Sequence, residues 1–180
     1  MGMAFVRDRF LRGQNVLLGY VTASLLLAVG AQITVPLGVV PFTLQTCVLF
    51  LLAHKNGALH TMNVVFLYIL EGLLGAPVFA GFSSGFPVLF GPTGGYIWGF
   101  IPAVFVYGKC VSCVKNSFWN TVFGLFFGLV TLYALGYLQL ASFVGFSEAY
   151  RCGVCLFLLP EMLKMSFTVS CCFCMNKRNG

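Results

Sequence analysis

Charged side chains are scarce in this sequence, and acidic ones are the scarcest. Only 8% of the 180 residues are charged and four are acidic, whereas 59% are hydrophobic. An ordinary soluble domain carries about 25% charged residues, so this composition cannot cover a surface that faces water. We expect the chain to lie in a lipid bilayer as a single integral-membrane domain over residues 1–180.

The motifs of several enzyme classes are also missing. The sequence has no G-x-x-x-x-G-K-[ST] phosphate loop, because Gly108-Lys109-Cys110 lacks both the upstream glycine and the hydroxyl. It contains neither H-E-x-x-H nor G-x-S-x-G. The sequence therefore predicts no ATPase, no metal site and no cofactor. An intramembrane enzyme with Glu161 or Glu71 as acid or base is a minor alternative.

The apolar residues fall into six runs separated by glycine, proline and single charges. At about 20 residues per span, they predict an all-α membrane protein with six transmembrane helices. The first run could be a signal peptide, since three arginines precede it, but the rest of the chain is equally apolar and favours a membrane helix. The runs are Val16–Thr34, Phe42–Ala53, Gly57–Leu74, Gly95–Val111, Ser117–Leu140 and Cys152–Met175.

The basic residues indicate the orientation of these helices. With the N-terminus in the cytoplasm, only Arg151 lies outside and Lys164 lies within the sixth run. This excess of inside charge is typical of membrane topology and not of nucleic-acid binding. It predicts that both termini are cytoplasmic and that the long uncharged loop Gly75–Gly94, between helices 3 and 4, is extracytoplasmic. The inside residues are Arg7, Arg9, Arg12, Lys55, Lys109, Lys115, Lys177 and Arg178.

The loop Gly75–Gly94 leads into the stretch GPTGGY, residues 91–96. It is too apolar to extend into water and too rich in glycine and proline to span the membrane as a helix. Non-helical backbone is tolerated at membrane depth only where protein or a cavity surrounds it. We therefore expect the loop to fold over the helices as a lid, with Gly91, Gly94 and Gly95 allowing tight turns or close approach to a ligand.

Two opposite charges lie inside the sixth apolar run. Lys164 is thirteen residues from both Arg151 and Lys177, which places it near mid-span, and Glu161 lies three residues earlier on the same helical face. A lysine facing lipid costs about 2.5–3.5 kcal/mol, so both side chains should face the interior. They form either a ligand site or a purely structural ion pair.

Other polar residues leave two interpretations open. Glu71 is either a second acidic partner or a residue at the edge of the loop, and Gln45 and Thr43 bond either a ligand or a neighbouring helix. Ser24-x-x-x-Ala28, Gly95-x-x-x-Gly99 and Gly124-x-x-x-Gly128 allow close helix packing, or, on the first helix, docking of a partner.

The pairs Cys110/Cys113 and Cys152/Cys155 have zinc-like spacing, but the predicted topology puts them on opposite membrane faces and favours free thiols.

Three segments resemble the BioY family, the biotin-capturing S components of energy-coupling-factor (ECF) transporters. They are Pro36–Gln45 (PLGVVPFTLQ), Tyr68–Phe79 (YILEGLLGAPVF) and Gly91–Tyr96 (GPTGGY), and the six-helix pattern extends the resemblance to nearly the whole chain. The family carries Asp-x-x-Lys in its last helix, where this chain has Glu161-Met-Leu-Lys164. The longer side chain keeps the charge but moves the carboxylate.

The resemblance implies a biotin transporter in a bacterial-type plasma membrane, a multi-pass protein working among lipids with an ECF scaffold and a pair of ATPases. Glu161 would accept hydrogen bonds from the ureido N–H groups of biotin, Lys164 would donate to a ligand oxygen, and small residues on the first helix would dock the scaffold. A transporter for another small vitamin or carboxylic acid is the alternative. The substrate-binding residues expected are Lys164, Glu161, Tyr96, Phe79, Gln45, Thr43, Gly91, Thr93, Gly94, Gly95 and Glu71, and the docking residues are Ser24 and Ala28.

Overall fold

The structure, a computed structural model, describes residues 2–36, 38–113 and 118–178. In the described residues, nearly all regular structure is helical, with one short hairpin. The elements are α1 (Gly2–Gln32), β1 (Thr34–Pro36), β2 (Pro41–Thr43), α2 (Gln45–Asn56), α3 (Ala58–Leu73), η1 (Ala80–Phe82), α4 (Phe86–Leu89), α5 (Gly94–Cys113), α6 (Phe118–Val144), α7 (Phe146–Gly153), η2 (Cys155–Phe157) and α8 (Leu158–Arg178).

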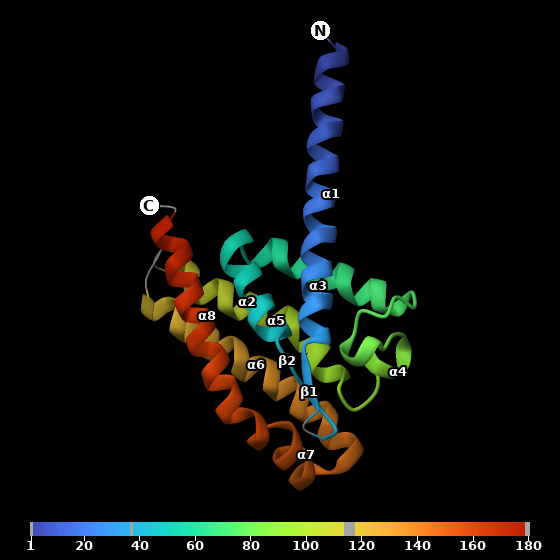
Figure 1. Ribbon diagram of the computed structural model, residues 1–180, viewed down its shortest axis with the longest axis vertical. Coiled ribbons are helices and arrows are strands. Elements are labelled where there is room, and N and C mark those ends of the chain that lie inside the picture. Colours follow the sequence, from blue (N-terminus) through green and yellow to red (C-terminus); the bar gives the residue numbers. More distant parts are fainter. Residues whose placement is uncertain (1, 37, 114–117, 179–180) are drawn as a thin grey trace.

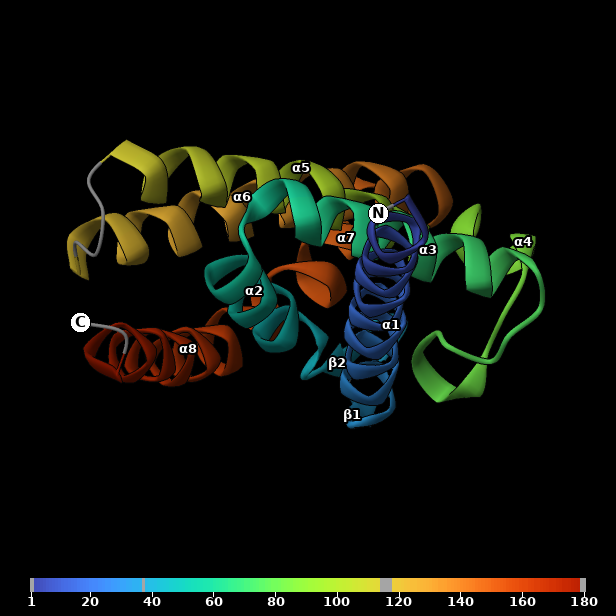
Figure 2. The same ribbon diagram turned by 90° about the horizontal axis from the view of Figure 1, so that it is seen from above.

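The long helices surround the short helix α2, which contacts α1, α3, α5 and α8. Helices α5 and α6 lie side by side along one side of the molecule (Figure 2), whereas α1 extends beyond the other helices at its N-terminal end (Figure 1). The start of α1 and the end of α8 point toward the top of Figure 1, and the β1–β2 hairpin and α7 lie toward the bottom. This arrangement gives the molecule two distinct ends.

Small residues explain the close packing of α5 against α6. A Cβ on Gly99 would lie 3.2 Å from the Leu132 carbonyl oxygen, and one on Gly128 would lie 3.1 Å from the Ala103 carbonyl oxygen. These glycines let helix backbones approach to a distance that a side chain would prevent. The Gly95-x-x-x-Gly99 and Gly124-x-x-x-Gly128 motifs therefore pack helices within the chain.

Each predicted apolar run corresponds to one helix, but three helices begin away from the expected residue, the first of them already at Gly2. The second helix begins at Gln45, because Thr34–Pro36 and Pro41–Thr43 pair as an antiparallel hairpin. The last helix begins at Leu158 and not at Cys152, because the connection before it forms two further short helices, α7 and η2. Gly145, with φ of 84°, separates α6 from α7, and Pro160 lies in the first turn of α8, where its missing N–H costs nothing.

The expected lid contains two short helices and covers one end of the helical bundle. Gln32 Nε2, at the end of α1, donates to the Phe79 carbonyl at 3.0 Å, and the Phe82 amide donates to Gln32 Oε1 at 2.9 Å. From α6, Gln139 Nε2 donates to the Gly91 carbonyl at 2.7 Å. Two glutamines from different helices therefore hold the ends of this segment.

Among the described residues, two helical stretches are long and apolar enough to cross a membrane by length and composition: Phe118–Val144 and Phe146–Met175. Two shorter apolar helices are Val16–Gln32 and Ala58–Leu73. Exposed leucine, valine and phenylalanine side chains cover the outside of these helices, which is the surface expected of a protein surrounded by lipid.

Candidate functional site

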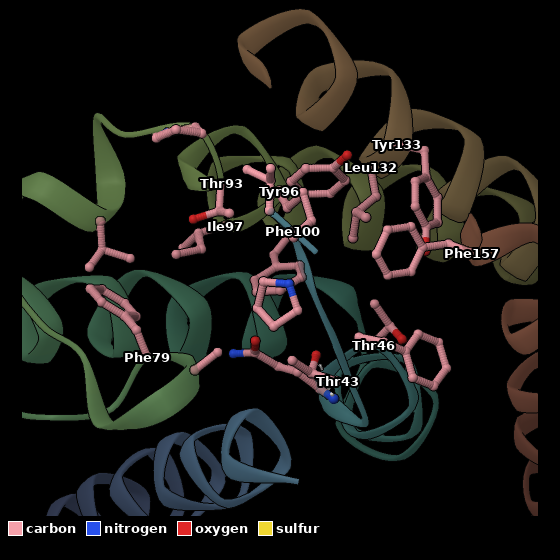
Figure 3. A pocket seen from close by; sticks show the side chains of 18 of the residues that line it. Thr43, Thr46, Phe79, Thr93, Tyr96, Ile97, Phe100, Leu132, Tyr133 and Phe157 are labelled. Atoms are coloured by element: carbon pink, nitrogen blue, oxygen red, sulfur yellow. Dashed lines mark hydrogen bonds between the residues drawn. The ribbon is translucent and has the colours of Figure 1, made fainter. Parts of the chain in front are cut away.

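A cavity of about 420 Å³ lies between the lid and the helices (Figure 3). Figure 3 shows Phe79 and Phe157 at opposite ends of it, with Tyr96 and Ile97 on one side and Thr43 and Thr46 on the other. Its lining comes from β2, α2, α3, the lid, α5, α6, η2 and α8, so residues far apart in the sequence meet here. The residues with polar side chains in this lining are Thr43, Gln45, Thr46, Tyr68, Ser83, Thr93, Tyr96, Tyr133, Glu161 and Lys164.

Lys164 lies on α8 with only 9% of its surface exposed, and its ammonium group is held by groups around it. It donates to Thr46 Oγ1 at 2.7 Å and to the Thr43 carbonyl oxygen at 2.9 Å, and it forms an ion pair with Glu161. The ammonium nitrogen also lies 4.1 Å from the centroid of the Phe42 ring, a cation–π distance. Three acceptors thus match the three N–H donors of Lys164, and its main effect is to fix the carboxylate beside the cavity.

Glu161 is 8% exposed and is held from two sides. Its Oε1 atom contacts Lys164 and also accepts a hydrogen bond of 2.9 Å from the Tyr133 hydroxyl on α6. Both contacts use the same carboxylate oxygen. The carboxylate is therefore oriented by two helices, beside a cavity that could hold a ligand with hydrogen-bond donors.

Gln45, the first residue of α2, contributes a buried amide to the same cavity. Its side chain is 5% exposed, and Nε2 has no hydrogen-bond partner among the described residues. The Tyr68 hydroxyl, which this amide approaches, donates to the Val78 carbonyl at 2.9 Å. A buried donor without an acceptor costs about 1–3 kcal/mol, so Gln45 Nε2 is a group that an acceptor on a ligand would satisfy.

Aromatic rings form the apolar walls. Tyr96 donates its hydroxyl to the Gly153 carbonyl at 2.8 Å and presents its ring to the cavity, and it contacts the Tyr133 ring edge to face. Phe79 is almost completely buried against Tyr68. Tyr133, Phe157 and Glu161 also line a second, nearly apolar groove of about 400 Å³ between α6 and α8. These three side chains therefore form the wall between the cavity and that groove.

The structure brings most of the expected binding residues together. Lys164, Glu161, Tyr96, Phe79, Gln45, Thr43 and Thr93 all line the cavity. The glycines Gly91, Gly94 and Gly95 lie at the turn into α5 and do not line it. A Cβ on Gly94 would collide with the Leu89 carbonyl, so Gly94 permits packing of the lid. A Cβ on Gly95 would lie 2.7 Å from the Gln139 side chain, so Gly95 permits the close approach of α5 to α6.

Glu71 and Ser24 lie outside the cavity and contact each other. The Ser24 hydroxyl, on α1, donates to the Glu71 carboxylate, on α3, at 2.5 Å, and Ser24 is completely buried. This pair joins two helices, so Ser24 is in the helix interface and not on a docking surface. Ala28 is partly buried and packs against the core.

Sequence reasoning missed several residues that complete the site. Thr46 and Tyr133 hold the ion pair, and Gln32 and Gln139 hold the lid. Thr46 follows the expected Gln45 by one residue. Its position shortly after the break at Pro41 is the only feature of the sequence that indicates a role in the site. The other three lie in apolar helices where nothing in the neighbouring sequence indicates a partner.

The fold and the cavity together define a helical protein with an apolar outer surface and an internal cavity beside a buried ion pair. The chain belongs to the BioY family, whose model matches residues 8–179. A protein of Pyrococcus horikoshii, named "Probable biotin transporter BioY", is 39% identical over 144 residues, covering 80% of this chain and 85% of the relative. The "Biotin transporter BioY" of Thermotoga maritima is 40% identical over 141 residues, covering 78% of this chain and 83% of the relative.

A solved structure has the same fold. It is the crystal structure of the S-component for biotin from an ECF-type ABC transporter. It superposes with a TM-score of 0.79 over 92% of this chain and 93% of that chain, at 18% sequence identity. This confirms the S-component fold that the resemblance predicted.

Proposed function

We propose that this chain is a biotin transporter, which captures biotin from outside the cell in its internal cavity and passes it to the cytoplasm. The observation that carries the proposal is the ion pair of Lys164 and Glu161 beside that cavity, close to the buried amide of Gln45. Two relatives that this chain matches over most of their length are named as biotin transporters, one of them as a probable one. Transporters, and not enzymes, are therefore the class in which this chain belongs.

The chemistry of the cavity fits that of biotin. The ureido ring of biotin offers two N–H donors and one carbonyl, and its sulfur-containing ring and valerate chain are apolar up to a terminal carboxylate. Glu161 would accept from the ureido N–H groups, and Gln45 Nε2 would donate to a ligand oxygen. The aromatic walls at Phe79, Tyr96 and Phe157 would contact the apolar rings and chain.

The direction of capture follows from the two ends of the molecule. In the proposed topology six helices cross the membrane and both termini are cytoplasmic, because the order of the apolar runs assigns eight basic residues to the inside and only Arg151 to the outside. The β1–β2 hairpin and the lid both contribute residues to the lining of the cavity. The cavity then opens toward the outside, beneath an extracytoplasmic lid, in a multi-pass protein of a bacterial-type plasma membrane.

Delivery requires partners that supply energy, because the sequence has no phosphate loop of its own. The solved neighbour is the S-component of an ECF-type ABC transporter, and the same assembly, a membrane scaffold with ATPase subunits, is proposed for this chain. Helix α1 offers the docking face: Leu17, Leu18 and Leu25 are all more than half exposed, and Ala28 lies on the same helix.

A transporter for another small vitamin or carboxylic acid is the second candidate. Glu161 in place of the aspartate of the family motif favours it, because the extra methylene keeps the charge but moves the carboxylate. Competition of labelled biotin with lipoate, thiamine and riboflavin on the purified chain separates the two. If biotin is the substrate, none of the three displaces it.

The proposed function is tested in cells that neither make nor import biotin. The chain is expressed with and without a scaffold and its ATPases, and accumulation of labelled biotin is measured. Parent protein with all partners should accumulate biotin, and Glu161→Gln, which keeps the shape but removes the charge, should not. Equal accumulation by this variant, present in the membrane at the same level, would contradict the proposal.

A further inference from the structure

The lid has an inner and an outer face. On α4 and its ends, Pro87 and Val88 line the cavity and Leu89 is completely buried. Phe86 and Phe90, one helical turn apart, do not line the cavity and are 63% and 61% exposed. Their rings stack on each other with centroids 5.8 Å apart and an interplanar angle of 16°. This part of the lid is therefore amphipathic, and the cavity does not account for its apolar outer face.

A third phenylalanine, Phe82 in η1, is exposed in the same segment, and its backbone is unusual. The residue is 72% exposed, and its φ of 56° lies in the left-handed region, which is unfavourable for any residue with a Cβ. No other non-glycine residue among those that the structure describes has a positive φ. The Gln32 side chain holds this conformation by accepting from the Phe82 amide at 2.9 Å. A strained backbone that leaves an aromatic ring exposed indicates a function for that ring.

The exposed rings of the lid continue onto the outer surface of α5. The Phe90 ring lies 6.4 Å from that of Trp98, measured between centroids, and the Trp98 indole N–H donates to the Leu89 carbonyl at 3.2 Å. Trp98 and Phe105 are seven residues apart, so they lie on the same face of α5, and both are exposed. That face belongs to the apolar outer surface of the helices, which is the surface expected to meet lipid. The outer face of the lid is therefore continuous with the lipid-facing surface of α5.

The charge and the position of the lid indicate what covers its outer face. Residues 75–94 contain no charged side chain, and α4 lies at the outer edge of the molecule in both views (Figure 1, Figure 2). Exposed aromatic rings beside a hydrogen-bonded tryptophan are typical of segments at the boundary between lipid headgroups and acyl chains. We propose that Phe82, Phe86 and Phe90 anchor the lid in this interfacial layer of the bilayer, on the extracytoplasmic side in the proposed topology. The surrounding lipid then stabilises the closed lid.

The contact with lipid does not depend on biotin as the substrate, so this inference and the proposed function can fail separately. Fluorescence quenching by brominated lipids measures the contact. The chain has two tryptophans, and Trp98→Phe/Trp119→Phe removes both of them. In that background Phe86→Trp places one fluorophore on the outer face of the lid. In nanodiscs, its fluorescence should fall, and it should fall more with bromine near the headgroups than with bromine near the ends of the acyl chains.

The matched control is Ser147→Trp in the same background. Ser147 is exposed on α7 beside the ion pair of Glu148 and Arg151, so water should surround the fluorophore there and brominated lipid should quench it little. Equally weak quenching of Phe86→Trp would place the outer face of the lid in water and overturn the proposal. Weak quenching together with two copies of the chain in each disc, counted by native mass spectrometry, would assign the face to a second copy and also overturn it.

Hydrogen exchange tests whether lipid stabilises the lid. In phosphatidylcholine nanodiscs, the peptide that spans α4 should exchange about ten-fold faster or more in Phe86→Ser/Phe90→Ser than in the parent, because two apolar side chains leave the lipid. If this variant does not fold, Phe90→Ser alone carries the comparison. Phe86→Leu/Phe90→Leu stays apolar but loses the ring stacking, so it should keep most of the protection. Equal losses in the leucine and serine variants would mean that ring stacking alone holds the lid, which overturns the proposal.

Phe143→Ser/Phe146→Ser controls for a general loss of apolar surface. Both residues are exposed, at the end of α6 and the start of α7, and both lie outside the lid. This variant should leave the exchange of the α4 peptide as it is in the parent. Exchange in the α4 peptide as fast as in Phe86→Ser/Phe90→Ser would mean that the lid responds to the stability of the whole protein, and the anchoring role would be excluded.

Discussion

The Tyr133 hydroxyl on α6 donates a hydrogen bond to the Glu161 carboxylate on α8, at 2.9 Å and at the same oxygen that Lys164 contacts. This bond joins two helices across the wall of the cavity. The position of the Glu161 carboxylate therefore depends on a residue that lies 28 positions away in the sequence. Removal of the Tyr133 hydroxyl gives the first prediction.

Tyr133→Phe should keep the ring in the wall while freeing Glu161 to rotate. A hydrogen bond to a charged group contributes about 1.5–3 kcal/mol, so biotin affinity should fall by roughly ten-fold or more. Isothermal titration calorimetry on the purified chain measures this. The control is Tyr137→Phe, in the same helix but outside the cavity that Tyr133 lines, and it should bind biotin as the parent does. Unchanged biotin affinity in Tyr133→Phe would contradict the role assigned to the Tyr133 hydroxyl.

Removing one charge of the buried pair should affect stability and binding in separable ways. Lys164→Met leaves Glu161 buried without its cation, which typically costs about 3–5 kcal/mol. The double variant Lys164→Met/Glu161→Gln has no charge left and should recover much of that stability. Thermal unfolding in one detergent measures the stability, and labelled biotin measures the binding. A double variant that unfolds like the parent and still captures biotin would show that the pair is only structural.

Gln45→Leu should move stability and affinity in opposite directions. The substitution removes a buried donor that has no partner among the described residues, so the ligand-free protein should gain about 1 kcal/mol or more of stability. Biotin loses a hydrogen bond at the same time and should bind more weakly. Melting temperatures with and without biotin report both effects, and a variant as strongly stabilised by biotin as the parent would exclude Gln45 from the binding site.

Gln32→Ala should loosen one end of the lid. The variant loses the bonds to Phe79 and Phe82, so the Phe82 amide should exchange its hydrogen faster and biotin should dissociate faster. Hydrogen exchange by mass spectrometry and a dissociation assay measure these rates. Gln139→Ala gives the comparison: it should expose residues near Leu89 and Gly91 and leave Phe82 protected. Loss of protection across the whole chain would instead mean general unfolding.

The sequence predicted the helices better than the connections between them. Long apolar runs and their flanking charges locate helices without knowledge of their neighbours, and Glu161 and Lys164 were recognisable because three residues along a helix share a face. The β1–β2 hairpin was not predicted, since its strands have only three residues each. Helix α7 was not predicted, because its composition is polar beside that of its neighbours.

The part of the candidate site that lies in sequence motifs was predicted. The residues that reach the site only through tertiary packing were missed. Gln45, Phe79 and Tyr96 belong to the motifs that resemble the family, and all three line the cavity. Tyr133 and Gln139 became recognisable only when α6 was placed against α8 and the lid. Glu71 was expected near the ligand but bonds Ser24, because the third helix turns this carboxylate toward α1.

Gln32 belongs to the same rigid helix whose exposed leucines form the proposed docking face. Helix α1 has 31 residues and would measure about 46 Å at 1.5 Å per residue, so a small tilt at one end becomes a displacement of several ångströms at the other. A partner that docks on this face and rotates α1 would therefore stretch the bonds from Gln32 to Phe79 and Phe82. Under the proposed function, docking on α1 would in this way promote release of biotin without any contact between the partner and biotin.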